Sequence, residues 1–345
     1  MKTHYTIPFF IPHAGCPFTC IFCQQKKISG RPGRALVGEV AKTIRRHLMT
    51  IPRKRTVREV AFFGGSFTGL SRSEQEAYLK AVRPFIRNGS IHRIRISTRP
   101  DLIDDQVLGL LKKYGVRSIE LGVQSICDDV LKAAKRGHTA ADVRRASRLI
   151  IKHGFVLGHQ IMVGLPKSTP DKETRTVRAA AVLGAKQARV YPVLVVRGTE
   201  LAALWKKGRY RPLGIDEAVA RCAGVVDRLT KNGITVLRCG LHPSEGLLTG
   251  RDLLAGAFHE SFGQMVATHR YGELFKAFLK KEKNPDAIRG ILFNPVDAAS
   301  VVGYKRKNAE FAEAFLGRKK LFRTSDSVDR GNVIVEYGDG HRKAL

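Results

Sequence analysis

The stretch His13-Ala-Gly-Cys16-Pro-Phe-Thr-Cys20-Ile-Phe-Cys23-Gln24 holds three thiols within eight residues, in the spacing C-x3-C-x2-C. Thiolates select iron–sulfur clusters or zinc. A 4Fe-4S cluster has four irons, so three cysteines would leave one iron open to another ligand. A zinc site of the Cys3His type, with His13 as the fourth ligand, is the alternative, although such sites usually pair two C-x2-C knuckles. The other cysteines, Cys127, Cys222 and Cys239, are scattered and predict no disulfide framework.

Length and composition predict one large domain with an appendage. The chain has 345 residues, 43% of them hydrophobic, which is enough for a sizeable core. No apolar run approaches the roughly 20 residues that a membrane span needs, so we expect no membrane association. A strand-like segment begins within the first five residues, where a secretory signal would lie. A cysteine cluster of this kind fits a reducing cytoplasm, which is the predicted location.

The charge balance is strongly basic. The chain has 61 Lys and Arg against 30 Asp and Glu, a net charge of +31. Such an excess attracts polyanions through counterion release, and it predicts RNA, or another polyanion, as a partner. A surplus that only serves solubility is the alternative. The cations cluster at Arg45-Arg46-His47, Arg53-Lys54-Arg55 with Arg58, Arg144-Arg145 with Arg148, and Lys305-Arg306-Lys307.

Apolar, β-branched runs alternate with helical patterns over the first two thirds of the chain. Six βα units in series predict an α/β fold, a partial parallel (β/α)6 barrel, in which chemistry lies at the carboxyl ends of the strands. Asp104 and Asp171 are predicted helix N-caps. Strands are expected at Thr6–Ile11, Val57–Phe63, Ile91–Ser97, Ser118–Val123, Phe155–Val163 and Ala188–Val196, and helices at Gly38–Leu48, Ser73–Ile86, Asp104–Tyr114, Asp128–Ala134, Ala140–His153 and Asp171–Leu183.

The pattern weakens after about residue 200. Helix Asp216–Lys231 and strand Ile234–Arg238 are expected to cover the barrel edge. We predict domains at residues 1–252 and 253–345, the second a small α+β cap. The stretch from Gly331 to Leu345 is expected to be loosely held. The cap should contain a helix at His259–Lys281, a strand at Ile288–Phe293, a helix near Asn308–Leu316 and a strand at Val333–Tyr337.

Polar residues and glycines follow the predicted strands at the end where the cysteine loop lies. Gly64 and Gly65 end the second strand, where backbone could approach a ligand closely, although a plain turn has the same signature. Glu120 lies inside an apolar strand, where an acid is rare unless it is paired. Four further polar positions could face the barrel mouth, each with an ordinary structural alternative: Ser97, Gln124, Arg136 and Gln160, the last beside His159.

Taken together, these segments resemble the radical S-adenosylmethionine (SAM) superfamily. The resemblance implies a 4Fe-4S cluster on Cys16, Cys20 and Cys23, whose open iron chelates SAM and whose electron cleaves it to a 5′-deoxyadenosyl radical. It also implies that Gly64 and Gly65 contact the SAM amino group, and that Arg136 pairs with its carboxylate. Ser97, Glu120, Gln124 and Gln160 complete the implied cofactor site.

The order of three segments narrows the resemblance. Glu120-Leu-Gly-Val-Gln124-Ser, then Arg136-Gly-His-Thr, then Tyr191-Pro-Val-Leu-Val-Val-Arg197 is similar to the radical SAM core of the Elongator catalytic subunit, over roughly residues 5 to 265. That family modifies the wobble uridine of tRNA, which implies tRNA as a partner, together with an electron donor of flavodoxin or ferredoxin type. The family also carries an acetyltransferase domain. The last 90 or so residues here contain no Arg/Gln-x-x-Gly-x-Gly/Ala loop for coenzyme A.

Three hypotheses remain open from the sequence. The first is a radical SAM enzyme that modifies RNA, the reaction itself being unassigned. The second is a radical SAM enzyme on a small polyanion such as a porphyrinogen, because coproporphyrinogen III oxidase shares the cysteine spacing. The third is a zinc-stabilised RNA-binding protein without catalysis.

Overall fold

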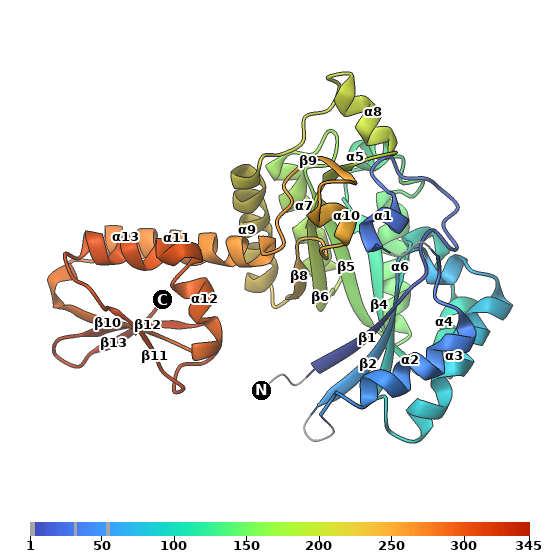
Figure 1. The fold of residues 1–345 in the computed structure, drawn as a ribbon, viewed down its shortest axis with the longest axis horizontal. Helices are drawn as coiled ribbons and strands as arrows, with labels where there is room; N and C mark the ends of the chain where they lie inside the picture. The colour runs from blue at the N-terminus through green and yellow to red at the C-terminus, as the bar shows by residue number, and fades with distance from the viewer. Residues whose placement is uncertain (1–3, 31–32, 53–55) are drawn as a thin grey trace. The chain divides into compact units, whose positions relative to one another are not determined.

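The computed structural model describes residues 4–30, 33–52 and 56–345 (Figure 1). The chain forms two compact units. The first comprises Met1–Ala218 and Arg228–Glu260, and the second comprises Val219–Asp227 and Ser261–Leu345. The division into functional domains at residues 252 and 253 stays a prediction. The basic cluster Arg53-Lys54-Arg55 lies outside the described residues.

Among the described residues, the first unit contains one curled sheet of seven strands, in the order β1-β2-β3-β4-β5-β6-β8, and every neighbouring pair is parallel (Figure 1). The predicted partial parallel barrel is therefore confirmed, and the strand expected at the barrel edge joins it as the seventh. The strands are β1 (His4–Phe10), β2 (Val57–Phe63), β3 (Arg93–Thr98), β4 (Val116–Gln124), β5 (Val156–Val163), β6 (Gln187–Pro192) and β8 (Thr235–Cys239).

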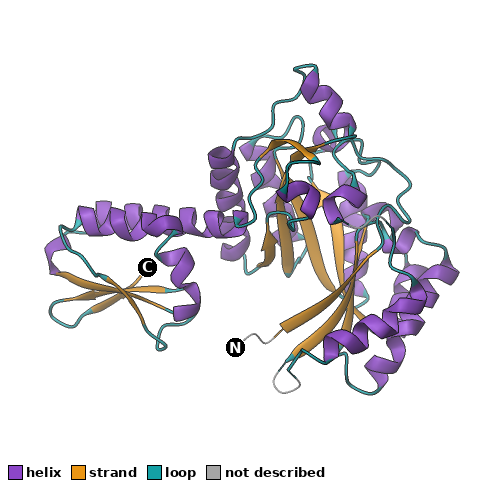
Figure 2. Ribbon diagram, viewed as in Figure 1, coloured by secondary structure: helices purple, strands orange, loops and turns teal. Residues whose placement is uncertain are grey.

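Helices of the first unit cover one face of this sheet (Figure 2). Phe62 on β2 packs its ring against Phe67 and Tyr78, and Tyr78 belongs to a helix. Alternate strand residues point to opposite faces, so the neighbours of Phe62 line the face away from the helices. The helices are α2 (Val37–Leu48), α3 (Arg72–Arg87), α4 (Asp105–Lys113), α5 (Asp128–Ala133), α6 (Ala140–Lys152) and α7 (Pro170–Val182). Helix α9 (Ile215–Lys231) is divided between the units, because Val219–Asp227 belongs to the second.

One of the two predicted N-caps is confirmed. The Asp104 side chain accepts a hydrogen bond from the Val107 N–H, 2.8 Å away. The prediction for Asp171 is wrong, because α7 begins with Pro170 and its N-cap is Thr169, whose hydroxyl accepts from the Lys172 N–H. Proline suits the first helical position, since its fixed φ is helical and its missing N–H is not needed there. Asp171 instead lies in the first turn, where its charge favours the helix dipole.

The predicted strand Ala188–Val196 is two strands. β6 ends at Pro192, and β7 (Leu194–Val196) pairs antiparallel with β9 (Leu253–Gly256) in a separate small sheet. In the described part of the first unit, three short helices were also not predicted, because segments of four to seven residues carry little periodicity. These are α1 (Gln25–Ser29), α8 (Glu200–Lys206) and α10 (Glu245–Leu248).

The described part of the second unit packs helices against a four-stranded sheet of order β11-β10-β12-β13. Phe275 and Leu279 of α11 join Val333 and Val335 of the sheet in one apolar core. Val333 and Val335 are fully buried, so the expectation that Gly331 to Leu345 is loosely held is wrong. The elements are α11 (Phe262–Lys281), β10 (Ile288–Phe293), α12 (Ala298–Val301), α13 (Lys307–Phe315), β11 (Phe322–Thr324), β12 (Val333–Tyr337) and β13 (Arg342–Ala344).

Candidate cofactor site at the carboxyl ends of the strands

The three cysteines lie in the loop that leaves the carboxyl end of β1. Cys20 is buried, and Cys16 and Cys23 are partly buried. Burial raises the pKa of the Cys23 thiol, and the neighbouring Cys20 and Cys16 raise it further, so that the pKa reaches about 12. The three thiols are therefore close enough to interact electrostatically. Within the described ranges, no three Cys, His, Asp or Glu side chains gather tightly enough to hold one metal ion.

Paired glycines interlock this loop with the segment that follows β2. A Cβ at Gly15 would lie 2.2 Å from the Ser66 carbonyl oxygen, and one at Gly69 would lie 2.0 Å from the Gly15 oxygen. A Cβ at Gly65, whose φ is +25°, would meet the Ala14 oxygen at 2.2 Å. Only glycine fits such close backbone contacts. The first role of Gly65 is therefore structural, because it allows the backbone contact that shapes the cysteine loop.

Gln25, two residues beyond Cys23, ties the same two segments together. Its side-chain oxygen accepts hydrogen bonds from the Gly65 N–H at 2.6 Å and from the His13 N–H. The Gln25 N–H in turn donates to His13 Nε2 at 2.9 Å, and the Gln24 amide oxygen lies 3.1 Å from the same nitrogen. His13 Nε2 is therefore already an acceptor within the loop, which gives no support to its role as a zinc ligand.

The Arg136 loop holds the cysteine loop from its other side. Arg136 Nη1 donates to Cys20 Sγ at 3.0 Å, and its Nη2 donates to the Gly122 oxygen at 2.7 Å. The Phe18 ring packs against Gly137 and lies 4.9 Å below the Arg99 guanidinium. Arg136 is only 6% exposed, so its side chain does not face solvent. Its Nε is buried without a hydrogen-bond partner among the described residues.

Charged side chains cross the sheet face away from the helices. Glu120 Oε1 accepts from Arg95 Nη1 at 2.7 Å, and its Oε2 accepts from Arg189 Nε at 2.8 Å. Arg95 also pairs with Glu59 at 2.8 Å. Burial raises the pKa of the Glu59 carboxyl, but the His4 hydrogen bond and the charges of Arg95 and Arg93 outweigh it and lower the pKa to about 2. Both oxygens of Glu120 are thus satisfied inside the protein.

The remaining predicted residues lie on this face as well. Ser97 is the register partner of Glu120 on the adjacent strand, and it is partly exposed. Gln160 Nε2 donates to Gln124 Oε1 at 3.4 Å, and Gln124 adopts a left-handed φ of +64°. His159 points to the other face, where its ring nitrogen lies 3.0 Å from the Ser147 hydroxyl. The structure therefore gathers the predicted polar residues and leaves His159 as a core residue.

Sequence reasoning missed several residues that shape this site. Arg95 is buried on β3, which alternates isoleucine with polar residues, so the sequence did not show that this arginine is buried. Arg189 lies 4.8 Å above the Phe63 ring. Gly15, Gly69 and Gln25 carried no signal, because their function depends on backbone from a distant segment.

The donor set suits an iron–sulfur cluster. Three thiols from one short loop, with the Arg136 cation against one of them, offer soft anionic ligands and a neighbouring positive charge. Each cysteine would bind a different iron, so the sulfurs need not meet at a common point.

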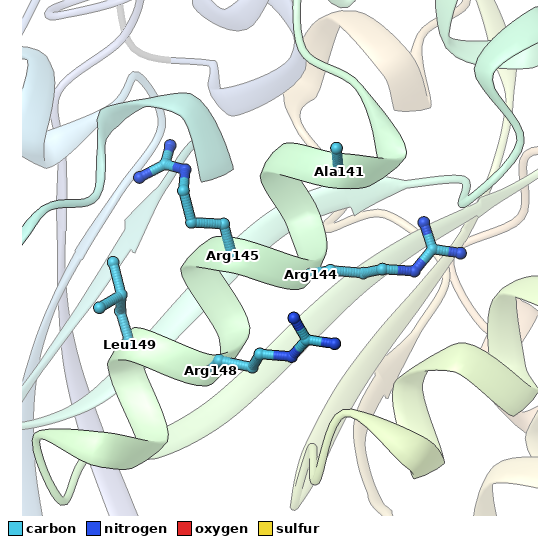
Figure 3. Close-up of a pocket in the computed structure, with 5 residues that line it drawn as sticks. All are labelled: Ala141, Arg144, Arg145, Arg148 and Leu149. Carbon is cyan, nitrogen blue, oxygen red and sulfur yellow. The ribbon is translucent and has the colours of Figure 1, made fainter.

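A cluster of three arginines lies on α6, among the helices that cover the sheet. Its pocket is lined by Ala141, Arg144, Arg145, Arg148 and Leu149 (Figure 3). Arg144 and Arg148 extend together from one side of the helix, and Arg145 extends from the other side (Figure 3). Arg145 donates to the Ile103 carbonyl at 2.8 Å. Two of the three arginines in this predicted cluster therefore share one surface.

Comparison with known families agrees with this geometry. Residues 10–180 match the family model of the radical SAM superfamily, and residues 185–271 match the model of the radical SAM C-terminal domain. The chain belongs to the radical SAM superfamily of enzymes, as the cysteine spacing predicts.

The curated proteins that are similar to this chain include Elongator-type proteins. The tRNA uridine(34) acetyltransferase of Methanocaldococcus infernus is 33% identical over 127 residues, which are 36% of this chain and 24% of that protein. Elongator complex protein 3 of Schizosaccharomyces pombe is 33% identical over 144 residues, which are 40% of this chain and 26% of that protein. The matched part thus spans about a quarter of the length of these relatives.

A solved structure shares the fold. The archaeal Methanocaldococcus infernus Elp3 with its N-terminus deleted superimposes with a TM-score of 0.63 and 19% identity, covering 84% of this chain and 70% of that one. At this identity the likeness concerns the fold alone. The resemblance to the Elongator core that the motifs predict is confirmed as a similarity in sequence over part of these relatives and as a shared fold, while the family shown is the radical SAM superfamily.

Proposed function

We propose that this chain is an RNA-modifying radical SAM enzyme, and that Cys16, Cys20 and Cys23 hold its 4Fe-4S cluster. The observation that carries the proposal is the cysteine loop itself. Glycine contacts hold it against the β2 loop, and the Cys20–Arg136 hydrogen bond holds it against the Arg136 loop. We further propose that SAM lies beside it, contacted by Gly64, Gly65, Ser97, Gln124 and Gln160.

Two predicted residues act on this site through their partners. Glu120 holds Arg189 and Arg95 in place on the sheet face away from the helices, so that the guanidinium of Arg189 stays above Phe63. Arg136 supplies a positive charge to Cys20 Sγ and fixes that side chain to the β4 backbone at Gly122. When bound, the cluster and SAM supply the electron and the 5′-deoxyadenosyl radical. The protein binds and orients the cluster and SAM, and it excludes water from them.

The proposed substrate is RNA, specifically tRNA. The named relatives include tRNA uridine(34) acetyltransferases, and a net charge of +31 favours a polyanionic substrate. Arg144 and Arg148 on α6 offer one surface for its phosphates. An electron donor of flavodoxin or ferredoxin type and a location in the cytoplasm stay predictions. No helix in the described residues is long and apolar enough to cross a membrane.

The test is anaerobic purification and cluster reconstitution, followed by an assay of 5′-deoxyadenosine release with and without tRNA. We expect about four irons per chain, SAM cleavage that needs a reductant, and stimulation by tRNA. A chain that binds one zinc instead, and no iron, would refute the enzyme proposal. Cleavage that tRNA does not stimulate, combined with undetectable tRNA binding at low salt, would retain the radical chemistry and reject RNA as the substrate.

A further inference from the structure

The second unit displays two aromatic rings that its core does not use. Phe311 is 36% exposed and Phe315 is 53% exposed, and both lie on α13. Residues four apart on a helix share one side, and these two ring centroids are 6.4 Å apart. The apolar core of the unit is instead built around Phe275, Phe293 and their neighbours. The two rings therefore form a surface platform and contribute little to the packed interior.

Cations border this platform in sequence at both ends. Lys305, Arg306 and Lys307 precede it, and Arg318, Lys319 and Lys320 follow it. Within the same stretch the acids are Glu310 and Glu313, and Glu313 is engaged by Arg306 at 3.3 Å and by the Lys320 N–H at 3.0 Å. Aromatic rings between basic segments are the composition of a site for single-stranded nucleic acid.

The turn that leads into α13 is held in an unfavourable conformation. Lys305 and Arg306 are consecutive non-glycine residues with φ of +51° and +61°, in the left-handed region that L-residues avoid. Strain of this kind persists where surrounding contacts impose it, and it gathers at functional sites. Here the contacts come from Thr268, whose hydroxyl accepts from the Tyr304 N–H at 3.1 Å and whose carbonyl accepts from Asn308 Nδ2 at 2.9 Å.

From these three observations we propose that the α13 platform, defined as Lys305, Lys307, Phe311 and Phe315, binds unpaired nucleotides of an RNA. The rings stack on bases, and the two lysines pair with phosphates. Single strands are favoured over duplexes, because bases inside an A-form helix are already stacked and cannot reach the rings. Residues beyond 271 lie outside both matched family ranges, so the site belongs to a part of the chain that those models do not cover. The inference rests on the proposed RNA substrate but not on the radical chemistry.

The experiment measures binding of the full chain to a fluorescein-labelled uridine dodecamer by anisotropy, across a series of salt concentrations. Phe311→Ala and Phe315→Ala should each weaken binding at least about fivefold, with an unchanged slope against salt, because no phosphate contact is lost. The double variant Lys305→Ala with Lys307→Ala should flatten that slope by about 0.7 for each lost phosphate contact. Val296→Ala removes another exposed apolar side chain of this unit, 62% exposed, and is the matched control that should bind like the parent.

Rescue by ring chemistry separates stacking from general apolar contact. Phe315→Tyr should retain binding, and Phe315→Leu should lose it, since leucine is apolar but cannot stack. Equal binding by both variants would overturn the proposal, as would a preference for a blunt RNA duplex over the dodecamer. Tight binding of phosphatidylserine vesicles that depends on the same two rings would also overturn it, in favour of a lipid surface.

The two proposals fail in different ways. If the parent chain cleaves SAM but does not bind the dodecamer at low salt, the α13 platform is rejected while the radical SAM assignment holds. If the chain binds the dodecamer through Phe311 and Phe315 but holds no iron and cleaves no SAM, the platform stands without the enzyme proposal. Phe311→Ala should leave cleavage of SAM in the absence of RNA unchanged, because the residue is remote in sequence from the cysteine loop.

Discussion

The two units treat charge in opposite ways. The first buries Glu59, Arg95 and Glu120 on one face of its sheet, each at most 3% exposed, and pairs them with one another. In the second unit the core is apolar, and the ion pairs lie at the surface, as in Glu336 between Arg323 and Arg342. Both units contain a parallel or mixed sheet beside helices, so the contrast does not come from architecture.

The difference agrees with the position of the proposed site in each unit. Buried ion pairs often contribute no more stability than apolar residues of the same volume, so their presence calls for another reason. In the first unit that reason is position: the charges lie on the sheet face that also carries the predicted cofactor residues. The second unit keeps an ordinary core, and its proposed activity lies on its exterior, at the α13 platform. Five predictions test this contrast.

The largest effect should come from the cysteine loop. Changing Cys16, Cys20 or Cys23 to Ala should abolish iron binding and SAM cleavage, because each is proposed to ligate one iron. Iron content and the visible spectrum after anaerobic reconstitution are the measurements. The triple variant of Cys127, Cys222 and Cys239 is the control and should keep its iron. Loss of a quarter or more of the iron in that control would show that ligands come from outside the loop.

The second prediction compares the loss of a buried carboxylate with the loss of an exposed one. Glu59→Gln should lower the free energy of unfolding at neutral pH by about 3 kcal/mol, because it leaves buried arginines unpaired. Glu336→Gln, the control in the second unit, should change it little, since exposed ion pairs contribute little. Urea unfolding of both variants at pH 7 gives the comparison. If both variants lose a similar free energy of unfolding, the buried and the exposed ion pairs do not differ in their contribution to stability.

Comparison of the parent with Glu59→Gln also tests a pH dependence of the stability, whose sign follows from the pKa of Glu59. The pKa of Glu59 is lowered in the folded protein from its ordinary value of 4.5 to about 2, so the unfolded chain binds its proton more readily. Its contribution is fully present above pH 4.5 and is lost as the pH falls toward 2. The parent should therefore lose stability over this window more steeply than Glu59→Gln. Parallel curves would mean that Glu59 is not the group responsible.

The third effect tests the glycine interlock. Gly69→Ala places a methyl group 2.0 Å from the Gly15 oxygen, so it should destabilise the first unit by about 1–3 kcal/mol and lower its iron content. Gly109→Ala lies in α4 with open space around it and should slightly stabilise the chain, since alanine favours helices. Iron content and thermal unfolding are compared. Full iron loading of Gly69→Ala would show that the loops adjust without cost.

The smallest effect concerns Arg136. Removing its charge from Cys20 Sγ with Arg136→Met should lower the reduction potential of the cluster, on the order of 50 mV or about 1 kcal/mol for one electron. Arg144→Met, on the outer surface of α6, is the charge-matched control. Potentiometric titration followed by electron paramagnetic resonance gives the value. An unchanged potential with weaker SAM binding would show that Arg136 acts on the SAM carboxylate instead.

Local pattern was enough to predict much of the fold. The strands Val57–Phe63, Ile288–Phe293 and Val333–Tyr337 are found at the predicted bounds, because short segments rich in apolar and β-branched residues favour buried strands. Short segments without a period, such as α1, were not predictable in this way. The strand at 188–196 was predicted as one piece, because its composition is uniform and only pairing with β9 divides it.

The sequence by itself determined the family, the parallel sheet and the cysteine loop, because spacing and periodicity are properties of neighbouring residues. Only the tertiary structure decided what Gly65, Glu120 and Arg136 touch. Gly65 meets Ala14, 51 positions earlier, Arg136 reaches Cys20, and Glu120 lies between Arg95 and Arg189. These contacts join segments far apart in the chain. A residue type can indicate that such a partner is needed, but only the folded backbone determines which one it meets.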